Sequence, residues 1–434
     1  MNTSVYVGLT ADYLHPGIAK VMKAAAEAGP ITVGLLTDEA IAAKKRVPHL
    51  DWSERKLIIE QFRNVERVVP QAEWLYGPNI LKYRPTSMVH GDDWQHGLGL
   101  ELRADALQAL SSYGGQLIEV PHTPGISSTW IAEKVREMGT TPEIRRRDLR
   151  RALACKPFVR IIETHSPLAA ILVESLELEN ELGRQEFDGF WSSSLADSLV
   201  LGKPDIEIVD ISTRLETVNR IFEVTQKPLI IDADTGGKPE HLEVHVKSME
   251  RLGISAMIIE DKVGLKRNSL LGNDVHQEQS TIVDFQEKIS IARAAAFSDE
   301  FMVIARVESL VLDKGMDDAL QRAHEYVAAG AHGVMIHSRR SDPNEIVLFA
   351  EKFRKHDSST PLIAVPTTYN GITDFALAQR GFNIVIYANQ MIRAAYPAMQ
   401  QAALTILQNG RSKECDSDIA SVANILKLIP KTIA

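Results

Sequence analysis

Downstream of residue 157, short apolar runs rich in β-branched residues each end on charged or hydroxyl residues. Eight such runs occur in order, FVRIIETHS, FDGFWSSSL, PLIIDADTG, AMIIEDK, MVIARVES, GVMIHSRR, PLIAVPTTY and FNIVIYANQ. Segments with helical periodicity, such as DDALQRAHEYVAAG, lie between them, so strands alternate with helices. Eight βα units predict a closed (β/α)8 barrel of the TIM type.

The polar residues that end these runs are suited to chemistry. The carboxyl ends of the strands of such a barrel meet at one face and form its active site. Here that face is expected to carry Trp191, Ser193, Asp232, Asp234, Glu260, Lys262, Arg306, Glu308 and His337. The pattern therefore predicts an enzyme with an acidic, metal-binding site.

The first part of the chain predicts a separate α/β domain. Five short strand-like runs, SVYVGL, ITVGLLTDE, ERVVP, SMVHGDD and GQLIEVP, alternate with helical segments such as IAKVMKAAAEAG. This pattern is typical of a Rossmann-like, doubly wound nucleotide-binding sheet, in which the turn after the first strand aims a helix N-terminus at phosphate. We therefore expect two domains, residues 1–140 and 141–434.

Length and composition agree with this division. The 434 residues exceed the roughly 250 of one barrel, and 44% hydrophobic with 24% charged residues is ordinary for a soluble globular protein. The start, MNTSVYVGLTADYL, lacks the pattern of a signal peptide, and no apolar run reaches the length of a membrane span. We expect a cytoplasmic protein that does not contact a membrane.

Cysteine and charge patterns exclude further classes of function. The two cysteines, Cys155 and Cys415, are expected to be free thiols without metal-binding spacing. A net charge of −9 argues against nucleic acid as a partner. The basic segment RRRDLRR, at 145–151, is interpreted as a solvated helix near the domain junction rather than as a binding patch.

Three acids at consecutive strand ends predict a metal site. Asp232, Asp234 and Glu260 offer hard oxygen ligands, the type that Mg²⁺ prefers. Each acid alone could instead cap a helix or pair with a base, but three together favour a metal. Lys266, Arg306 and His337 add donors for a phosphate or carboxylate. The aperiodic stretch from Asp261 through KVGLKRNSLLGNDVHQEQ is a candidate lid.

These residues closely resemble the phosphoenolpyruvate mutase family of the isocitrate lyase superfamily. Its EDKxxxKxNS signature stands here as Glu260-Asp261-Lys262, Lys266, Asn268 and Ser269, and its DADTG, ARVE and HSKK segments match 232–236, 305–308 and 337–340. The resemblance implies catalytic roles for Asp205, Lys266, Asn268, Arg306 and His337. It implies substrate binding by Trp191, Ser193, Ser194, Leu195 and Ser269, and Mg²⁺ binding by Asp232, Asp234 and Glu260.

The resemblance implies interconversion of phosphoenolpyruvate and phosphonopyruvate, in which the phosphoryl group moves between oxygen and carbon. No cysteine of the KKCGH type lies on the lid, so the carbon–carbon cleavage of the related lyases is not expected. The nearest alternative is phosphonopyruvate hydrolase, which typically has threonine at the position of Asn268. Asn268 therefore favours the mutase.

The N-terminal residues resemble the glycerol-3-phosphate cytidylyltransferase family. Thr10, Asp12, His15 and Gly17 match its TFDxxHxGH segment, GDDW at 91–94 matches its base-binding and ribose-binding segment, and Ile126-Ser127-Ser128-Thr129-Trp130-Ile131 matches its ISTTxI signature. The implied nucleotide-binding residues are Thr10, Asp12, His15, Lys44, Arg46, Arg55, Asp92, Trp94, Ser127, Ser128 and Thr129.

Two departures from that pattern bear on catalysis. Ile18 replaces the second histidine of HxGH, and His122 replaces an arginine that usually precedes ISTT. Loss of one transition-state donor costs about 2 to 4 kcal/mol. A domain that binds nucleotide without turning it over, or that serves only assembly, is therefore the alternative to a cytidylyltransferase.

The fusion of the two domains resembles the bifunctional enzymes of fosfomycin biosynthesis. That resemblance implies a second activity, transfer of CMP from CTP to 2-hydroxyethylphosphonate, although no residue identifies the acceptor. The C-terminal segments ALTILQNG and IASVANILKLI have apolar spacing suited to packing on a neighbouring subunit or within the chain. We expect a homo-oligomer, a dimer or a tetramer.

Overall fold

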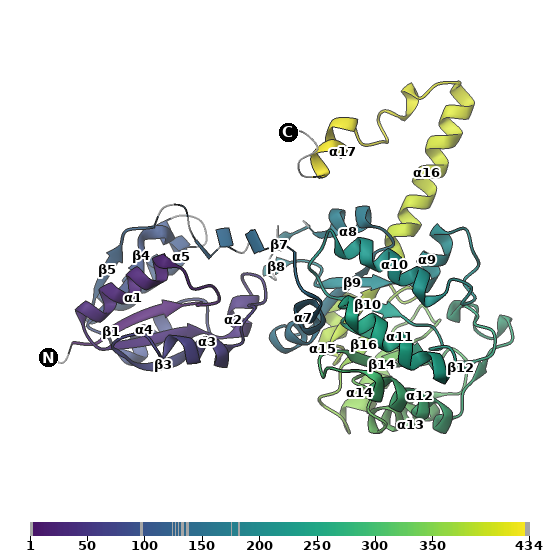
Figure 1. Cartoon of the computed structure of the whole chain (residues 1–434), viewed down its shortest axis with the longest axis horizontal. Helices are drawn as coiled ribbons and strands as arrows, with labels where there is room; N and C mark the ends of the chain where they lie inside the picture. Colours follow the sequence, from purple (N-terminus) through teal and green to yellow (C-terminus); the bar gives the residue numbers. More distant parts are fainter. Residues whose placement is uncertain are drawn as a thin grey trace. The chain divides into compact units, whose positions relative to one another are not determined.

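The structure is a computed structural model that describes residues 3–429, apart from 96–98, 124, 126, 129, 132–133, 136–138, 175 and 181–182. The chain forms two compact units (Figure 1). The N-terminal unit comprises Met1–Met138, Ala154–Lys156 and Glu179–Gln185, and the barrel unit comprises Gly139–Leu153, Pro157–Leu178 and Glu186–Ala434. The functional division predicted at residue 140 stays a prediction.

The N-terminal unit is built on a parallel sheet of five strands in the order β3-β2-β1-β4-β5. The strands are β1 Val5–Leu9, β2 Ile31–Leu36, β3 Val65–Gln71, β4 Ser87–Gly91 and β5 Gln116–Val120. β1 lies at the centre, with Val5 opposite Ile31 and also opposite Ser87. The doubly wound sheet predicted from the five apolar runs is confirmed.

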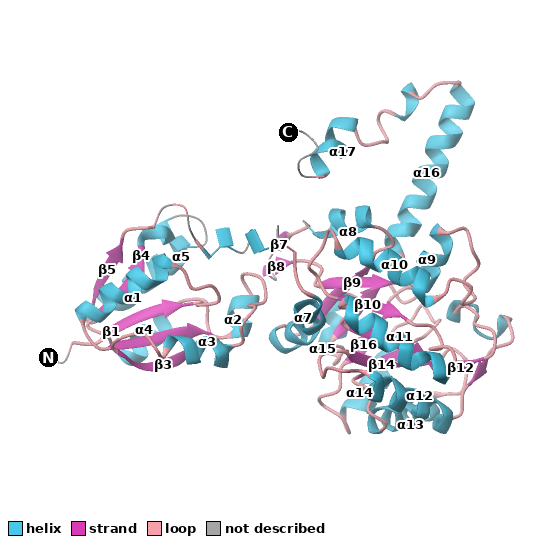
Figure 2. Cartoon of the chain, in the orientation of Figure 1, coloured by secondary structure: helices cyan, strands magenta, loops and turns pink. Residues whose placement is uncertain are grey.

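Helices cover both faces of this sheet (Figure 2). They are α1 Pro16–Ala28, α2 Asp38–Ala42, α3 Trp52–Ile59, α4 Gly77–Tyr83, the 3-10 turn η1 Asp92–Gln95, and α5 Gly99–Ser111. α1 begins at its N-cap His15, whose ring nitrogen accepts from the Gly17 amide. It buries Ile18, Val21, Met22 and Ala25, which share one helix face.

The barrel unit is a closed parallel barrel in the order β10-β11-β14-β15-β16-β17-β6-β9. Its strands are β6 Val159–Glu163, β9 Gly189–Ser192, β10 Leu229–Asp232, β11 Ala256–Glu260, β14 Met302–Val307, β15 Gly333–Ile336, β16 Leu362–Ala364 and β17 Ile384–Tyr387. Each strand falls within one of the eight predicted apolar runs. The prediction of a TIM-type barrel is therefore confirmed.

Helices surround the barrel and bury their apolar faces on the strands (Figures 1 and 2). They are α7 Pro142–Cys155, α8 Pro167–Glu174, α9 Ser194–Val200, α10 Ile211–Phe222, α11 Pro239–Leu252, α12 Ile282–Ala295, α13 Met316–Ala328, α14 Asn344–Arg354 and α15 Asp374–Gln379. Phe285, Tyr326 and Phe349 of these helices are fully buried in one core with Ile259 and Val334 of the strands. This core supports the strand ends rigidly.

The predicted lid follows β11. Two short strands, β12 Lys262–Val263 and β13 Glu278–Gln279, pair antiparallel and enclose the 3-10 turn η2 Ser269–Asp274. Asp261 anchors the base of this segment, because its buried carboxylate accepts from the Glu308 amide (3.0 Å) and the Gln279 side chain (2.8 Å). A second two-stranded sheet is formed by β7 Leu178–Asn180 and β8 Gly183–Gln185, which lie between α8 and β9 in the sequence.

The basic helix α7 differs from expectation. Arg145 and Arg146 are each only 5% exposed. The Arg145 guanidinium lies 3.8 Å from the centre of the Phe222 ring, and Arg146 donates to the Glu250 carbonyl at 2.6 Å. Ser255, just before β11, donates to the Arg145 carbonyl. The prediction of a solvated helix is wrong for this face, because its arginine stems and backbone close the amino end of the barrel.

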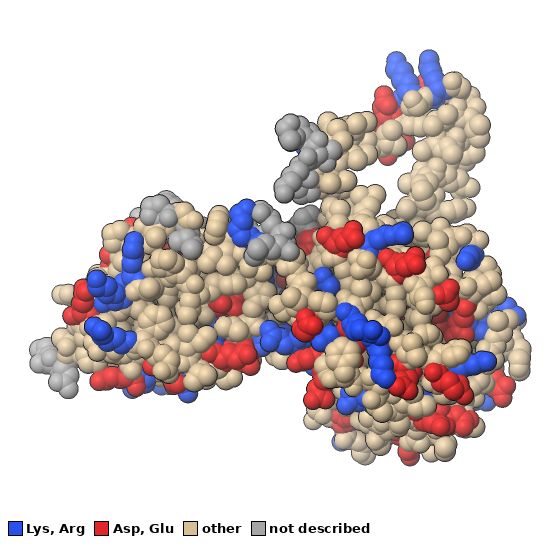
Figure 3. Space-filling model, viewed as in Figure 1, with Lys and Arg blue, Asp and Glu red and all other residues tan. Residues whose placement is uncertain are grey.

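The chain continues into an arm made of α16 Gln390–Asn409, η3 Lys413–Cys415 and α17 Val422–Leu428. Of α16, Ile392 alone is buried among the described residues, whereas Leu407 is 81% exposed and Val422 of α17 is 72% exposed. Much of the arm's surface in Figure 3 is uncharged. None of the described helices combines the length and hydropathy that a membrane crossing requires.

We expect His332, which directly precedes β15, to lower the free energy of unfolding at acid pH. Its Nδ1 accepts from the Val303 amide (3.0 Å), and burial, with the charges of Arg150 and Arg293, lowers its pKa from 6.5 to about 3. As the pH falls, the unfolded state therefore binds the proton before the folded state does. The stability that the neutral imidazole of His332 contributes above pH 6.5 is lost as the pH falls toward 3.

His332→Asn keeps an acceptor but does not titrate. We expect this variant to lose less free energy of unfolding than the unsubstituted protein between about pH 7.5 and about pH 5 in urea denaturation. Equal losses in the two proteins would contradict the assignment.

Candidate active sites

A cavity opens at the carboxyl ends of the barrel strands. All ten residues that were predicted as catalytic or substrate-binding line it: Trp191, Ser193, Ser194, Leu195, Asp205, Lys266, Asn268, Ser269, Arg306 and His337. They come from β9, α9, the α9–α10 loop, the lid, β14 and the loop after β15. Thr367 and Asn389, from the loops after β16 and β17, also line it and were not predicted.

The start of α9 forms one wall of this cavity. Ser193 is the N-cap of α9, and its hydroxyl accepts from the Ala196 amide. Ser194 donates to Asp232 Oδ2 at 3.0 Å. Free backbone amides at a helix start are suited to a carboxylate. This geometry fits the predicted role of residues 193–195 in holding a substrate carboxylate.

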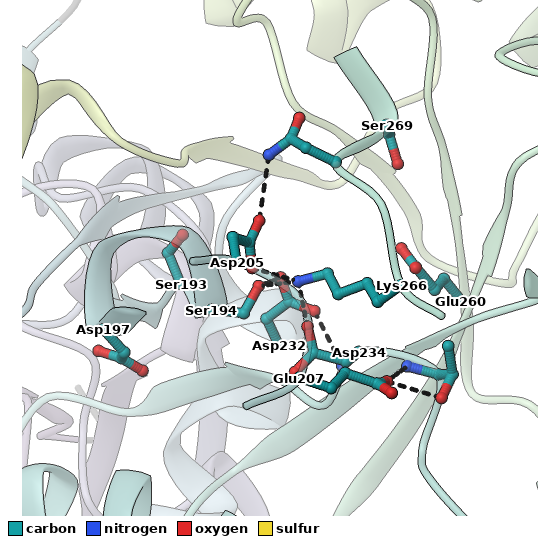
Figure 4. Close-up of polar contacts among 12 residues, drawn as sticks. Ser193, Ser194, Asp197, Asp205, Glu207, Asp232, Asp234, Glu260, Lys266 and Ser269 are labelled. Carbon is teal, nitrogen blue, oxygen red and sulfur yellow. Dashed lines mark hydrogen bonds and ion pairs between the residues drawn. The ribbon is translucent and has the colours of Figure 1, made fainter. Parts of the chain in front are cut away.

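Two lid residues contact the α9–α10 loop (Figure 4). The Lys266 ammonium donates to Ser194 Oγ (2.5 Å), to Asp205 Oδ1 (2.7 Å) and to Asp234 Oδ1. Asn268 Nδ2 donates to Asp205 Oδ2 at 3.2 Å. The Lys266 side chain is only 4% exposed. The lid is therefore closed over the cavity, and Asp205 is its contact on the opposite rim.

Arg306 and His337 supply donors on the other side of the cavity. Burial opposes the charge on Arg306, but Glu308, Glu260 and Asp232 outweigh it and raise the pKa of the guanidinium. Arg306 also donates to Ser269 of the lid. Burial and the Arg306 charge lower the pKa of His337, whose Nδ1 lies 3.4 Å from Glu308 Oε1. This side of the cavity thus combines a guanidinium whose charge is stabilised with an imidazole whose pKa is lowered.

The three predicted metal ligands lie at the ends of β10 and β11, but each is paired with a cation. Asp234 contacts Lys266 and lies 3.4 Å from Arg214, and Glu260 lies 3.0 Å from Arg306. Within the described residues, no three His, Cys, Asp or Glu side chains are close enough together to hold a metal ion. These acids therefore lie at the same end of the barrel, but their carboxylate oxygens do not point toward one common position.

The chemistry of this donor set nevertheless fits Mg²⁺. Burial raises the pKa of Asp232, but the charges of Lys266, Arg306 and Arg214 outweigh it and lower that pKa to about 2, so Asp232 is ionised. The two buried carboxylate oxygens of Glu260 form ion pairs with Lys262 (3.2 Å) and Arg306 (3.0 Å), but neither accepts a hydrogen bond of good geometry. Burial raises the pKa of Glu260 to about 7. Hard carboxylate oxygens of this kind suit Mg²⁺.

Arg214 supports this site and was not predicted. It is 2% exposed on α10, donates to Asp197 Oδ2 (2.8 Å) and to the carbonyl of Asp232, and lies against Asp234. A signal existed in the sequence, because Arg214 shares the apolar face of α10 with Val218 and Ile221. A charge in that stripe indicates a buried ion pair.

The N-terminal unit has a second cavity, at the carboxyl ends of β1, β4 and β5. Five predicted nucleotide-binding residues line it: Thr10, His15, Trp94, Ser127 and Ser128. His15 Nδ1 accepts from the Gly17 amide, so its Nε2 carries the proton toward Ser128 Oγ, 3.2 Å away. Gly17 and Ile18, at the start of α1, line the same cavity. A helix N-terminus here suits a phosphate.

The other described residues that were predicted for this site are not among those that line the cavity. Asp12 pairs with Arg46 at 2.5 Å and accepts from the backbone amides of His49 and Leu50. Arg55 is fully buried against Asp38 and two backbone carbonyls. Asp92 accepts from the His122 amide. Lys44 is outside the described cavity lining, and Thr129 lies outside the described residues.

Lys45 takes the position expected of Lys44. It lines the cavity, and its ammonium lies 5.3 Å from the centre of the Trp74 ring. Burial lowers the pKa of the Lys45 ammonium, and the negative charge of Asp93 opposes that shift. The rings of His90 and Trp94 stack at 3.7 Å between centres and form an aromatic wall. The Lys45 cation, the start of α1 and this aromatic wall together suit a nucleoside triphosphate.

Comparison with protein families agrees with this geometry. A family model described as phosphoenolpyruvate phosphomutase matches residues 149–407, more than half of the chain. The chain belongs to the phosphoenolpyruvate mutase family. A second model, described as cytidylyltransferase-like, matches residues 6–134, so this mutase-family chain carries a cytidylyltransferase-like domain before its barrel.

Individual relatives of this mutase-family chain include both a hydrolase and a mutase. A phosphonopyruvate hydrolase from a Variovorax species is 36% identical over 64% of this chain and 93% of the relative. A solved phosphoenolpyruvate phosphomutase from Streptomyces platensis has a TM-score of 0.60 and 33% identity, covering 67% of this chain and 95% of that one. A phosphonopyruvate hydrolase solved with oxalate and Mg²⁺ has a TM-score of 0.58 and 34% identity, covering 67% and 95%.

Proposed function

We propose that the barrel interconverts phosphoenolpyruvate and phosphonopyruvate. The observation that carries this proposal is the closed lid, which places Lys266 and Asn268 against Asp205 in the cavity that also holds Arg306 and His337. The reaction breaks one P–O bond and forms one P–C bond within the same substrate. It consumes no proton and no second reactant.

The cavity residues would each perform a distinct task. The amides of 193–195 hold the substrate carboxylate, while Arg306, His337 and Asn268 hold the phosphoryl group as it leaves the enol oxygen and is captured by the methylene carbon. The closed lid excludes water, which would otherwise capture the phosphoryl group. Mg²⁺ held by Asp232, Asp234 and Glu260 would supply positive charge to the substrate oxygens.

Phosphonopyruvate hydrolase activity is the second candidate for the barrel, since a hydrolase is 36% identical to it. Asn268 favours the mutase, because its amide can donate to a phosphoryl oxygen while it also closes the lid on Asp205. Phosphorus NMR of phosphonopyruvate with the protein and Mg²⁺ separates the two reactions. The mutase yields phosphoenolpyruvate, and the hydrolase yields inorganic phosphate and pyruvate.

We propose further that the N-terminal unit transfers CMP from CTP to a small phosphonate, with 2-hydroxyethylphosphonate as the acceptor, as in fosfomycin biosynthesis. Support comes from the cavity that joins the start of α1, His15, Lys45 and the stacked rings of His90 and Trp94. The acceptor rests on the resemblance alone. Release of pyrophosphate from CTP only when 2-hydroxyethylphosphonate is present would support the assignment.

The alternative for this unit is nucleotide binding without turnover, because Ile18 stands where the related enzymes have a second histidine. CTP that binds without pyrophosphate release in the presence of several phosphonates would favour that alternative.

We also propose a homo-oligomer that covers the exposed apolar residues of α16 and α17. Light scattering of the full chain tests this state directly.

A further inference from the structure

The loop between α9 and α10 carries Asp205 on an otherwise exposed segment. Residues 201–204 and 207–208 are exposed, whereas the Asp205 side chain is only 10% exposed because it faces the lid. The two carboxylate oxygens of Asp205 accept from Lys266 and Asn268. Closure of the lid therefore depends on where this loop holds Asp205.

Glu207 ties the same loop to the barrel. Its Oε1 accepts from the Thr235 amide at 2.8 Å and from the Thr235 hydroxyl at 2.7 Å (Figure 4). Its backbone has a φ of 60°, in the left-handed region that residues other than glycine rarely adopt. Two hydrogen bonds to one acceptor offset that unfavourable conformation.

Thr235 is itself held in place. It directly follows Asp234, and its carbonyl accepts from Lys288 of α12 at 2.8 Å. Contacts thus run from α12 through Thr235 and Glu207 to the loop. Glu207 is two residues from Asp205, a span of at most about 7 Å, so a shift at Glu207 moves Asp205.

We propose that Glu207 and Thr235 are positioning residues that set the place of Asp205 and, through it, closure of the lid. This inference deepens the proposed function of the barrel, because lid closure there excludes water and aligns the substrate. The competing explanation is a surface contact that stabilises the loop but has no effect on the lid.

The first measurement is hydrogen exchange of the backbone amides of the lid, residues 262–279, in the full chain without substrate. We expect faster exchange in Glu207→Ala and in Thr235→Val, which remove the acceptor and the hydroxyl donor. Glu207→Gln keeps an oxygen acceptor and should restore protection. Lys203→Ala, a matched change in the same exposed loop, should exchange like the unsubstituted protein.

The second measurement is steady-state conversion of phosphonopyruvate. A misplacement of about 1 Å caused by a residue away from the chemistry can cost about 100-fold in rate, and we expect a loss of that order in kcat for Glu207→Ala, with recovery in Glu207→Gln. Unchanged lid exchange in both Glu207→Ala and Thr235→Val overturns the inference. Absence of turnover by the unsubstituted protein would defeat the proposed function instead, and lid exchange would still decide the role of Glu207.

Discussion

Asn268→Ala is expected to abolish conversion of phosphonopyruvate to phosphoenolpyruvate while the protein stays folded. The alanine removes the amide that donates to Asp205 Oδ2 and that faces the cavity beside Arg306 and His337. It thus removes both a lid contact and a proposed donor to the phosphoryl group. Loss of one transition-state donor typically costs about 100- to 1,000-fold in kcat, which phosphorus NMR and a coupled pyruvate kinase assay can follow.

A matched control lies three residues further along the lid. Leu271 is 43% exposed and is not among the described residues of the cavity lining, so Leu271→Ala should retain turnover. Circular dichroism and urea midpoints of both variants report on folding. Unchanged turnover by Asn268→Ala would remove Asn268 from the site.

Asn268→Thr tests the balance between the two reactions of the barrel. Threonine is shorter and cannot donate through an amide, so we expect more water to reach the phosphoryl group and inorganic phosphate to appear. If Asn268→Thr loses both reactions equally, the choice between mutase and hydrolase depends on other residues.

The barrel was predictable because its strands are buried on both sides and therefore read as continuous apolar runs. Runs such as PLIIDADTG and AMIIEDK place their last polar residues on the strand ends, and the structure has Asp232 and Glu260 there. The ten cavity residues come together for the same reason, since parallel strands all end at one face.

Packing of charges could not be read from the same pattern. Buried acids need cations nearby, since an unpaired charge inside a protein costs several kcal/mol. Which cation pairs with which acid depends on side-chain reach between elements far apart in the chain. Arg214 reaches Asp197 and Asp234 from α10, and Arg145 and Arg146 turn into the barrel end. Periodicity indicates that Arg214 is buried, but it does not identify the partner of any of these arginines.

The nucleotide cavity shows the same limit at the scale of one residue. Lys44 and Lys45 follow the short helix α2, and the resemblance to cytidylyltransferases implied that Lys44 binds the nucleotide. In the structure the chain turns there, because the amides of both lysines donate to the Ile41 carbonyl. This turn brings Lys45 into the cavity lining beside Trp74. A sequence alone does not fix the direction of a side chain in such a turn.

Lys45→Met should therefore abolish release of pyrophosphate from CTP in the presence of 2-hydroxyethylphosphonate. Methionine keeps an apolar stem against Trp74 but removes the cation that would neutralise the triphosphate, and loss of such a contact typically costs about 100- to 1,000-fold in kcat. Phosphonopyruvate conversion in the barrel should be unaffected in the same preparation, which serves as an internal control for folding.

Lys44→Met is the matched variant, since it removes one adjacent charge of the same sign. If Lys45 contacts the triphosphate, Lys44→Met retains turnover, and CTP binding measured by calorimetry weakens only in Lys45→Met. Loss of turnover in Lys44→Met alone would assign the phosphate contact to Lys44. Should the unsubstituted protein bind CTP without releasing pyrophosphate, the calorimetric comparison still decides between the two lysines, because binding of the triphosphate requires the cation whether or not the bond is broken.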